Sequence, residues 1–166
     1  MRPPGVCPQN IKVGDNYQNY LKTVWREFAQ HEEIKALAGK VAIELANEPV
    51  NVYSASGVKY GYDYGKGQFL APSALHDFFQ PVVDVIRQAG FTGIIWVPGA
   101  GYQSNYVGYK EYPISDNNFG YAVHVYSGWY GNITDNNCNP QTFITNLHND
   151  VPVVEFKPVM VTEIDW

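Results

Sequence analysis

The sequence predicts an α/β fold in which parallel strands alternate with helices. Two observations support this prediction: short apolar runs of strand length recur along the chain, and longer amphipathic segments with helical spacing separate them. Strands that alternate with helices imply parallel pairing through right-handed crossovers. The runs are mostly apolar rather than alternating, as expected for a parallel sheet that is covered on both faces.

The first expected element is a helix that begins at Asp15 or Asn16 and ends before Gly39. Asp and Asn side chains cap helices well, and glycine is common just beyond the last turn. Apolar residues recur at helical spacing within this segment, namely Tyr17, Leu21, Val24, Trp25 and Phe28. The pattern therefore predicts one amphipathic helix.

The next expected element is a strand over residues 41–46, whose sequence is Val-Ala-Ile-Glu-Leu-Ala. Pro49 prevents continuation and favours an extended backbone at Glu48, the residue before it. Residues 51–67 are rich in Gly, Tyr and Ser, which predicts a loop.

A second helix is expected over residues 72–89, because apolar residues again recur at helical spacing. Gly90 closes this helix, and Pro81 can kink it. The apolar residues 93–97 predict the next strand. Residues 101–119 are polar and predict a long loop with room for a short helix.

The last three expected elements are a strand, a helix and a strand. Residues 121–126 form an apolar run that switches abruptly to Ser-Gly. A helix is expected from Pro140 or Gln141 to about Asn149, because proline is favoured in the first helical turn. Residues 159–162 then predict the final strand.

Composition limits the classes of function. The chain has 166 residues, with 45% hydrophobic and 16% charged residues, which is typical of a globular protein. Residues 1–166 are therefore expected to form a single domain. The net charge is −5 and Lys and Arg do not cluster, so nucleic acid and anionic membranes are poor candidate partners. No apolar stretch approaches the roughly 20 residues that cross a bilayer.

Two glutamates carry the candidate chemistry. Glu48 follows the first predicted strand and Glu163 follows the last. Because the carboxyl ends of parallel strands meet at one edge of a sheet, both side chains are expected to lie together. A pair of carboxylates is what hydrolysis of a glycosidic bond requires, one as acid and one as nucleophile or base. The alternative is that each glutamate only caps a helix or forms an ion pair.

Three motifs resemble those of glycoside hydrolase family 5, the cellulase family of retaining (β/α)8 glycosidases. They are Ile-Glu-Leu-Ala-Asn-Glu-Pro at 43–49, His-Val-Tyr at 124–126 and Val-Thr-Glu at 161–163, in the order and at the spacing of that family. The resemblance implies an endo-acting retaining β-glycosidase that hydrolyses β-1,4-glucan of the cellulose type. It also implies secretion, although no signal peptide is visible in this chain.

The resemblance assigns roles to individual residues. It implies that Glu48 is the acid/base and that Glu163 is the nucleophile, ionised and hydrogen-bonded by Tyr126. It implies that Asn47 donates to the sugar 2-hydroxyl and that His124 and Tyr126 line the catalytic subsite. It implies neither a cofactor nor a metal.

The resemblance also implies an incomplete barrel. A TIM (β/α)8 barrel needs about 250 residues, whereas this chain supplies about four strands, which correspond to strands four to seven. The expected fold is thus a partial, half TIM barrel with flanking helices. Its open sheet edges are expected to pair with a second copy, giving a homodimer that completes the barrel, or with a missing segment.

Several residues have two interpretations. Trp96 and Trp129 can stack on a glucosyl ring or serve packing alone, and the same choice applies to the Tyr-rich loops. Glu44 lies below the strand tip and is expected to bind inside the barrel or to pair with Lys or Arg rather than to be catalytic. Cys7 and Cys138 can form a disulfide or remain free thiols.

The main alternative function belongs to a different class. A non-catalytic carbohydrate-binding module, or an inactive remnant of such an enzyme, would keep the aromatic groove without a complete catalytic site. Mixed-linkage glucan, mannan and xylan are alternative substrates if the chain is active. The sequence alone does not choose among these β-glycans.

Overall fold

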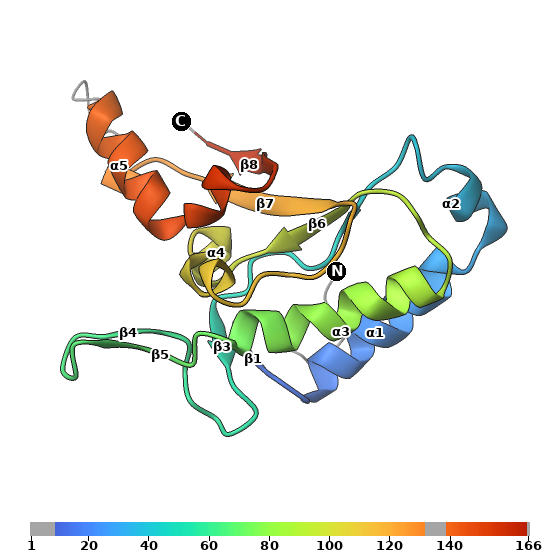
Figure 1. Cartoon of the computed structure of the whole chain (residues 1–166), viewed down its shortest axis with the longest axis horizontal. Helices are drawn as coiled ribbons and strands as arrows, with labels where there is room; N and C mark the ends of the chain where they lie inside the picture. The colour runs from blue at the N-terminus through green and yellow to red at the C-terminus, as the bar shows by residue number, and fades with distance from the viewer. Residues whose placement is uncertain (1–8, 132–138, 166) are drawn as a thin grey trace.

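A curled sheet of four parallel strands forms a half-barrel at the centre of the computed structural model, which describes residues 9–131 and 139–165 (Figure 1). The strands, in spatial order, are β2 (Ile43–Glu44), β6 (Ile95–Pro98), β7 (Phe119–Val125) and β8 (Val159–Ile164). Every neighbouring pair is parallel, and the spatial order follows the chain order. The predicted parallel α/β architecture is confirmed. Cys7 and Cys138 lie outside the described residues.

Helices α1 (Asn16–Ala29) and α3 (Ala74–Gln88) pack side by side and cover one face of the sheet (Figure 1). Asp15 caps α1, because its carboxylate accepts a hydrogen bond from the backbone N–H of Gln18. The expected continuation of this helix toward Gly39 is wrong: a separate helix, α2 (Glu32–Ala36), follows a break. The buried stripe of α1 ends with Ala29, and beyond the break Ile34 and Ala38 are only partly buried against the core.

Pro81 lies inside α3 and is compensated by Gln18 of α1. Proline has no N–H, so the carbonyl of Asp77 one turn earlier loses its usual helical donor. The Nε2 of Gln18 donates to that carbonyl at 3.0 Å and to the carbonyl of Phe78 at 2.7 Å. Gln18 is buried, and its amide therefore ties the two helices together where the helical ladder is broken.

The segment predicted as a loop over residues 51–67 contains additional strands. β3 (Asn51–Tyr53) pairs in parallel with β1 (Asn10–Lys12), and β4 (Gly61–Asp63) forms a hairpin with β5 (Gln68–Leu70). Each strand has three residues, too few for an alternating pattern to stand out. The hairpin projects from the body of the molecule (Figure 1).

The remaining elements lie in the connections between β6 and β7 and between β7 and β8. They are α4 (Ala100–Gln103), η1 (Val107–Lys110), η2 (Trp129–Gly131), α5 (Pro140–Asp150) and η3 (Pro152–Glu155). The predicted helix at 140–149 is confirmed, with Asn139 as its cap. The short helix expected within 101–119 corresponds to η1.

The Tyr-rich loops divide between packing and exposure. Tyr106 and Tyr109 are fully buried, and their rings contact each other and the buried ring of Tyr121 on β7. The hydroxyl of Tyr109 donates to the carbonyl of Pro98 at 3.0 Å, so its polar end is satisfied. Packing is therefore the role of these three rings. Other loop tyrosines remain exposed, namely Tyr62, Tyr64, Tyr102 and Tyr112.

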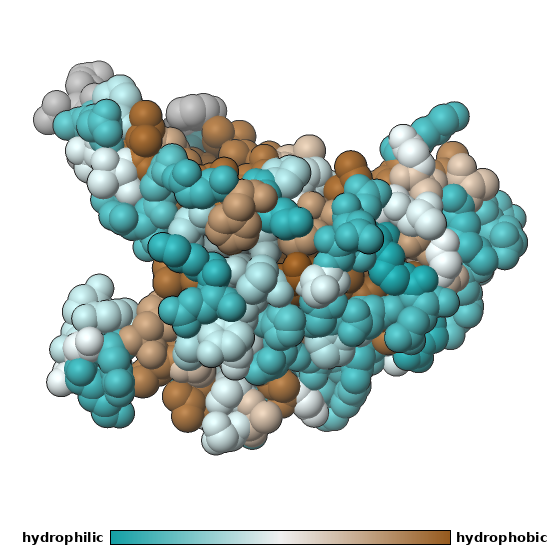
Figure 2. All heavy atoms as spheres, viewed as in Figure 1, coloured by the Kyte–Doolittle hydropathy of each residue, from teal (hydrophilic) through white to brown (hydrophobic). Residues whose placement is uncertain are grey.

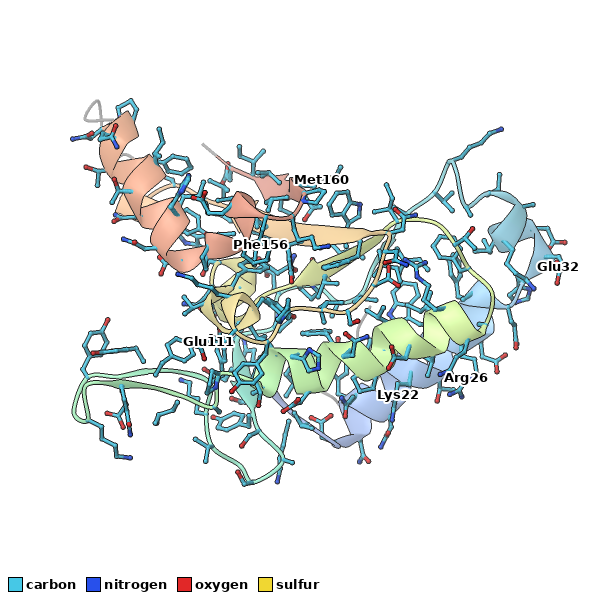
Figure 3. The ribbon with its side chains drawn as sticks, viewed as in Figure 1. Lys22, Arg26, Glu32, Glu111, Phe156 and Met160 are labelled. Atoms are coloured by element: carbon cyan, nitrogen blue, oxygen red, sulfur yellow. The ribbon has the colours of Figure 1, made fainter. Side chains whose placement is uncertain are left out.

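Strand β8 is an open edge of the sheet. Its residues Met160, Val161 and Ile164 are 45%, 48% and 51% exposed, although all three are apolar. Figure 3 labels Met160 and, just before the strand, the exposed Phe156. An uncovered parallel edge with apolar side chains is a surface that invites pairing. Within the described residues, no helix has the length and apolar character needed to cross a membrane.

Candidate active site

Glu48 is held at the tip of β2 in an unusual backbone conformation. Its φ is +50°, in the left-handed region, so the expected extended backbone is wrong. The backbone N–H of Glu48 donates to Oε1 of Gln103 at 2.7 Å, which fixes this conformation from across the sheet. Such a conformation costs on the order of 1–3 kcal/mol in a residue other than glycine and is concentrated at functional sites.

Glu163 reaches the same face because the pairing of β7 and β8 contains a register shift. Val123 pairs with Val161, but the next residue, His124, pairs with Glu163 rather than with Thr162. One extra residue on β8 thus brings Glu163 opposite His124. Since residues in register on neighbouring strands point to the same face, the glutamate and the histidine face each other.

His124 lies between the two candidate catalytic glutamates. Its Nδ1 is 3.1 Å from Oε1 of Glu48 and 3.5 Å from Oε2 of Glu163. One carboxylate oxygen of each glutamate and the imidazole nitrogen lie within 4.8 Å of one another. His124 is fully buried, whereas the side chains of Glu48 and Glu163 are 26% and 39% exposed. The structure therefore brings together the two acids that are far apart in the sequence and leaves both open to a ligand.

Tyr126 and Trp129 extend the site on the side of Glu163. The hydroxyl of Tyr126 donates to Oε2 of Glu163 at 2.6 Å, as expected. This hydrogen bond raises the pKa of Tyr126 to about 12, because losing the phenolic proton would place two negative charges side by side. The ring of Trp129 lies 5.2 Å from that of Tyr126. Both aromatic rings are thus next to the candidate nucleophile.

A polar network lies behind His124 and is centred on Glu44. Oε1 of Glu44 is 3.9 Å from Nε2 of His124, which is within range of a charge interaction though beyond hydrogen-bond distance. The same oxygen accepts hydrogen bonds from Nε2 of Gln103 at 2.9 Å and from Oγ1 of Thr162 at 3.3 Å. Of the two alternatives for Glu44, the pairing with Lys or Arg is not found among the described residues, where its partners are a histidine, an amide and a hydroxyl.

The charges of this network set the protonation of His124. Burial alone would lower the pKa of the imidazole, but the interactions with Glu44 and Glu48 and the charge of Glu163 outweigh it and raise the pKa. For Glu44, burial favours the neutral acid, yet the contacts with His124, Gln103 and Thr162 prevail and lower its pKa. The arrangement therefore favours a protonated His124 next to an ionised Glu44.

The two remaining predicted site residues, Asn47 and Trp96, lie in surroundings that differ from each other. Asn47 is exposed beside Glu48. Trp96 lies over Gly120 and lines a pocket with residues that precede the strands, such as Val41 and Asn118. The structure therefore does not bring Trp96 to the tips of the strands, which argues against its expected role in binding substrate.

Gln103 is the site residue that the sequence interpretation missed. It is buried, and its amide joins the backbone of Glu48 to the carboxylate of Glu44. It lies in a polar stretch that gives no local sign of burial.

A divalent cation is one ligand that this cluster could accept. Glu48, His124 and Glu163 each offer one donor atom, and those atoms lie within 4.8 Å of one another. Two carboxylates and an imidazole form a donor set suited to Zn²⁺ or a similar ion. The same three groups, with a proton on the imidazole, form a hydrogen-bonded cluster that needs no metal.

The comparison with protein families identifies the family of this chain. The Cellulase family, glycosyl hydrolase family 5, matches residues 7–165. The chain belongs to glycoside hydrolase family 5. A search of curated protein sequences found no match.

Solved structures of family 5 enzymes share the fold of this chain. A β-glucanase from Saccharophagus degradans superposes with a TM-score of 0.66 at 18% identity, over 90% of this chain and 40% of that enzyme. A family 5 cellulase from an Icelandic hot spring isolate gives 0.60 at 21% identity, over 91% of this chain and 41% of that enzyme. An endo-β-1,4-glucanase from Xanthomonas axonopodis pv. citri gives 0.56 at 20% identity, over 93% and 51%.

The family 5 fold is present here in part. The chain spans 40% of the length of the Saccharophagus enzyme and 51% of that from Xanthomonas. The predicted half-barrel of a cellulase-like protein is thus confirmed.

Proposed function

We propose that this chain carries the catalytic pair of an endo-acting retaining β-glycosidase that hydrolyses β-1,4-glucan. The observation that carries the proposal is the approach of Glu48 and Glu163 around His124, with carboxylate oxygens within 4.8 Å. Retaining enzymes hold their two carboxyl groups about 5–5.5 Å apart, whereas inverting enzymes need about 6.5–9.5 Å. The short separation favours a double displacement.

In the first step, the Glu163 carboxylate attacks the anomeric carbon while Glu48 gives its proton to the departing glycosidic oxygen. The bond between the anomeric carbon and that oxygen breaks, and an ester joins the sugar to Glu163. Tyr126 donates to Glu163 at 2.6 Å before attack, which holds the carboxylate in one orientation. Glu48, now ionised, is left as a base.

In the second step, Glu48 takes a proton from a water molecule whose oxygen attacks the anomeric carbon. The ester bond breaks and Glu163 leaves as a carboxylate, so the sugar keeps its original configuration. His124 contacts Glu48 at 3.1 Å, and its positive charge offsets the negative charge that Glu48 acquires in the first step. These two steps need no cofactor and no metal.

The substrate proposal rests on chemistry and on the family. The β-glucanase from Saccharophagus degradans has been crystallised with cellotetraose, and exposed rings such as Trp129 suit the apolar faces of glucosyl units. An insoluble polymer of this kind is met outside the cell, so we also propose that the protein is secreted.

The test measures reducing sugar released from carboxymethylcellulose by the chain and by its Glu48→Gln and Glu163→Gln variants. Each variant should lose activity by about 10³-fold or more, because a group that acts in bond cleavage is removed. Glu32→Gln, on α2 away from the strand tips (Figure 3), is the matched control and should retain full activity. Hydrolysis that survives both substitutions would mean that other residues are catalytic.

Azide separates the two roles. With an activated aryl cellobioside, azide should restore turnover to Glu163→Ala by forming the α-glycosyl azide, and to Glu48→Ala by forming the β-glycosyl azide. The configuration of the product thus identifies nucleophile and acid/base independently of each other. The same configuration from both variants contradicts the assignment.

A second function is favoured by the length of the chain, which spans 40% of the Saccharophagus enzyme. In this alternative, the half-barrel binds β-glucan without cleaving it. Binding of cellotetraose with no release of reducing sugar, in wild type and variants alike, would favour this alternative.

A further inference from the structure

The backbone of the short element α4 winds in the left-handed sense. Gly101 has φ and ψ of 59° and 51°, Tyr102 has 60° and 39°, and the φ of Gln103 is +61°. A hydrogen bond from the N–H of Ser104 to the carbonyl of Ala100, at 3.0 Å, closes this left-handed turn. Consecutive left-handed residues are rare, because the Cβ of an L-residue crowds the following carbonyl oxygen. Tyr102 and Gln103 therefore adopt this conformation at an energetic cost.

The left-handed turn lies at the inner end of a hollow in the surface. Figure 2 shows the surface indented between the part formed by α5 and the part formed by the β4–β5 hairpin, and α4 lies at the inner end of this indentation in Figure 1. Among the described residues, five other than glycine have a positive φ, and three of them are Tyr102, Gln103 and Glu48. A fourth, Tyr130, donates its hydroxyl to the carbonyl of Ser104 at 2.9 Å. Backbone strain is thus concentrated around this turn and Glu48.

The three residues of the turn bind three consecutive residues that include Glu48. The first two N–H groups of the turn donate to the carbonyls of Val50 and Pro49 at 3.0 and 3.1 Å. The side chain of Gln103 provides the third contact, since its Oε1 accepts from the N–H of Glu48 at 2.7 Å. A right-handed turn would follow the mirror-image path and direct the same groups elsewhere. The hand of the turn therefore matters for the attachment of residues 48–50.

Gln103 in turn anchors the left-handed turn to the sheet. Its side chain is fully buried, and its Nε2 donates to Oε1 of Glu44 on β2 at 2.9 Å and to the carbonyl of Ala122 on β7 at 3.2 Å. Tyr102, in contrast, is 43% exposed, so its left-handed backbone does not serve to bury its ring. The conformation of Tyr102 instead provides an N–H that reaches the segment 48–50.

We infer that the left-handed turn is a positioning element for the acid/base of the proposed hydrolysis. By holding residues 48–50, it fixes the Glu48 carboxylate beside Nδ1 of His124, at 3.1 Å, so that it can reach the departing glycosidic oxygen. An acid must lie within hydrogen-bond distance of the atom that it protonates, and a small displacement of Glu48 therefore slows the reaction. The inference rests on the proposed function, because that function makes Glu48 the acid.

The test replaces Tyr102 by two residues that differ in their tolerance of a left-handed backbone. Tyr102→Asn should keep the turn, because asparagine adopts positive φ more readily than most residues. Tyr102→Val should disrupt it, because a β-branched side chain is strongly disfavoured there. Both substitutions remove the ring, so any contribution of the ring is lost equally. The matched control is Ala71→Val, because Ala71 also has a positive φ, of +47°, and lies outside the turn.

The readout compares kcat/KM of the 166-residue chain for two substrates. Cellotetraose has a leaving group that needs protonation, whereas dinitrophenyl cellobioside has one that does not. Tyr102→Val should fall below Tyr102→Asn by about 10- to 100-fold on cellotetraose and by less than about threefold on the dinitrophenyl substrate. Loss of folded protein or of substrate binding would lower both values equally. Ala71→Val should differ from the parent by less than about twofold on both substrates.

Ser104→Ala tests the same inference if Tyr102→Val does not fold. It removes the hydrogen bond from Oγ of Ser104 to the carbonyl of Gly101, at 2.6 Å, which braces the turn. It should lower kcat/KM on cellotetraose by about three- to tenfold, with less than about twofold change on the dinitrophenyl substrate. The inference is overturned by equal losses on both substrates, or by the same kinetics in Tyr102→Val and Tyr102→Asn.

Hydrogen exchange at the amide of Glu48 gives a readout that does not depend on activity. This N–H is bonded to Gln103, so its exchange rate, measured by NMR, reports whether the attachment is intact. Exchange should be about tenfold or more faster in Tyr102→Val than in Tyr102→Asn.

The exchange result separates this inference from the proposed function. Faster exchange in Tyr102→Val, with no hydrolysis by the parent chain, supports the positioning of Glu48 and removes the enzyme. Equal exchange in Tyr102→Val and Tyr102→Asn, with hydrolysis that is lost in Glu48→Gln, overturns the positioning role and leaves the hydrolase. Equal exchange without any hydrolysis overturns both.

Discussion

Glu163 lies opposite His124 because β8 carries one more residue than β7 at that point. Without the shift, Thr162 would pair with His124, and Glu163 would point to the other face of the sheet. With it, the side chains of both Thr162 and Glu163 reach the concave face, where they contact Glu44 and Tyr126 respectively. This one-residue shift thus places the candidate nucleophile Glu163 in the site and also allows Thr162 to hydrogen-bond to Glu44.

Tyr126→Phe should lower kcat on carboxymethylcellulose by about 10- to 100-fold, because Glu163 loses the donor that orients it. The thermal unfolding midpoint should stay close to that of the parent, since the hydroxyl that is removed is not buried. Kinetics and thermal unfolding measured on the same preparation check both expectations. Unchanged kcat would show that the hydrogen bond has no part in catalysis.

Glu44→Gln should lower the pKa of His124, because one of the three carboxylates that interact with the imidazole loses its charge. The pKa of His124 in the folded chain is raised above the unfolded value of about 6.5. Protonation of His124 therefore contributes stability that is complete below about pH 6.5 and is lost as the pH rises through the folded-state pKa.

Two measurements follow the substitution at Glu44. An NMR titration of the imidazole should shift to lower pH in Glu44→Gln and remain in place in the control Glu32→Gln. Urea unfolding at a series of pH values should show that the stability contributed by His124 protonation is lost at lower pH in Glu44→Gln than in the parent chain. A titration that coincides with that of the parent chain contradicts the coupling of Glu44 and His124.

Gln103→Met should destabilise the fold by about 2–4 kcal/mol. Methionine has nearly the same volume and length as glutamine but cannot replace its amide. The N–H of Glu48 and the carboxylate of Glu44 therefore each lose a hydrogen-bond partner. Urea unfolding measures the change. Gln30→Met, at the exposed end of α1, is the control and should alter the free energy of unfolding by less than about 0.5 kcal/mol.

The exposed edge at β8 predicts self-association. Analytical ultracentrifugation should find a species larger than the 18.7 kDa of one chain, as expected if two copies pair their open edges. Val161→Lys should shift the population toward the monomer, because a charge would have to be buried in the new sheet. Ile144→Lys, an equally exposed residue on α5, should leave the assembly unchanged. A well-folded monomer of the parent chain would contradict the expected homodimer.

The sheet and its helices could be predicted from sequence because their signals are local and repeated. The strand around residues 93–97 and the helix around residues 72–89 each show a long run with a single period. The three-residue strands β1 and β3 could not be predicted in this way. Each is too short for a pattern, and each depends on a partner about 40 residues away.

The two glutamates of the candidate site could be predicted from the sequence. The backbone geometry that positions them could not. Glu48 and Glu163 follow apolar runs, so the rule that parallel strands end at one edge places them together. The register shift at Thr162 and the left-handed backbone of Glu48 leave no trace in the sequence. Both arise from contacts across the sheet, of which the bond from Glu48 to Gln103 is one.

The amide of Gln103 has a consequence for natural variation. Its oxygen is committed to the chain at Glu48 and its nitrogen to the acid at Glu44, so neither end is free to accept a different neighbour. Among diverging homologues, positions 44 and 103 should be replaced together rather than one at a time. An aliphatic side chain at either position would leave the polar group at the other without its hydrogen-bond partner. Covariation of these two positions would thus reflect a requirement of the fold and not a requirement of substrate binding.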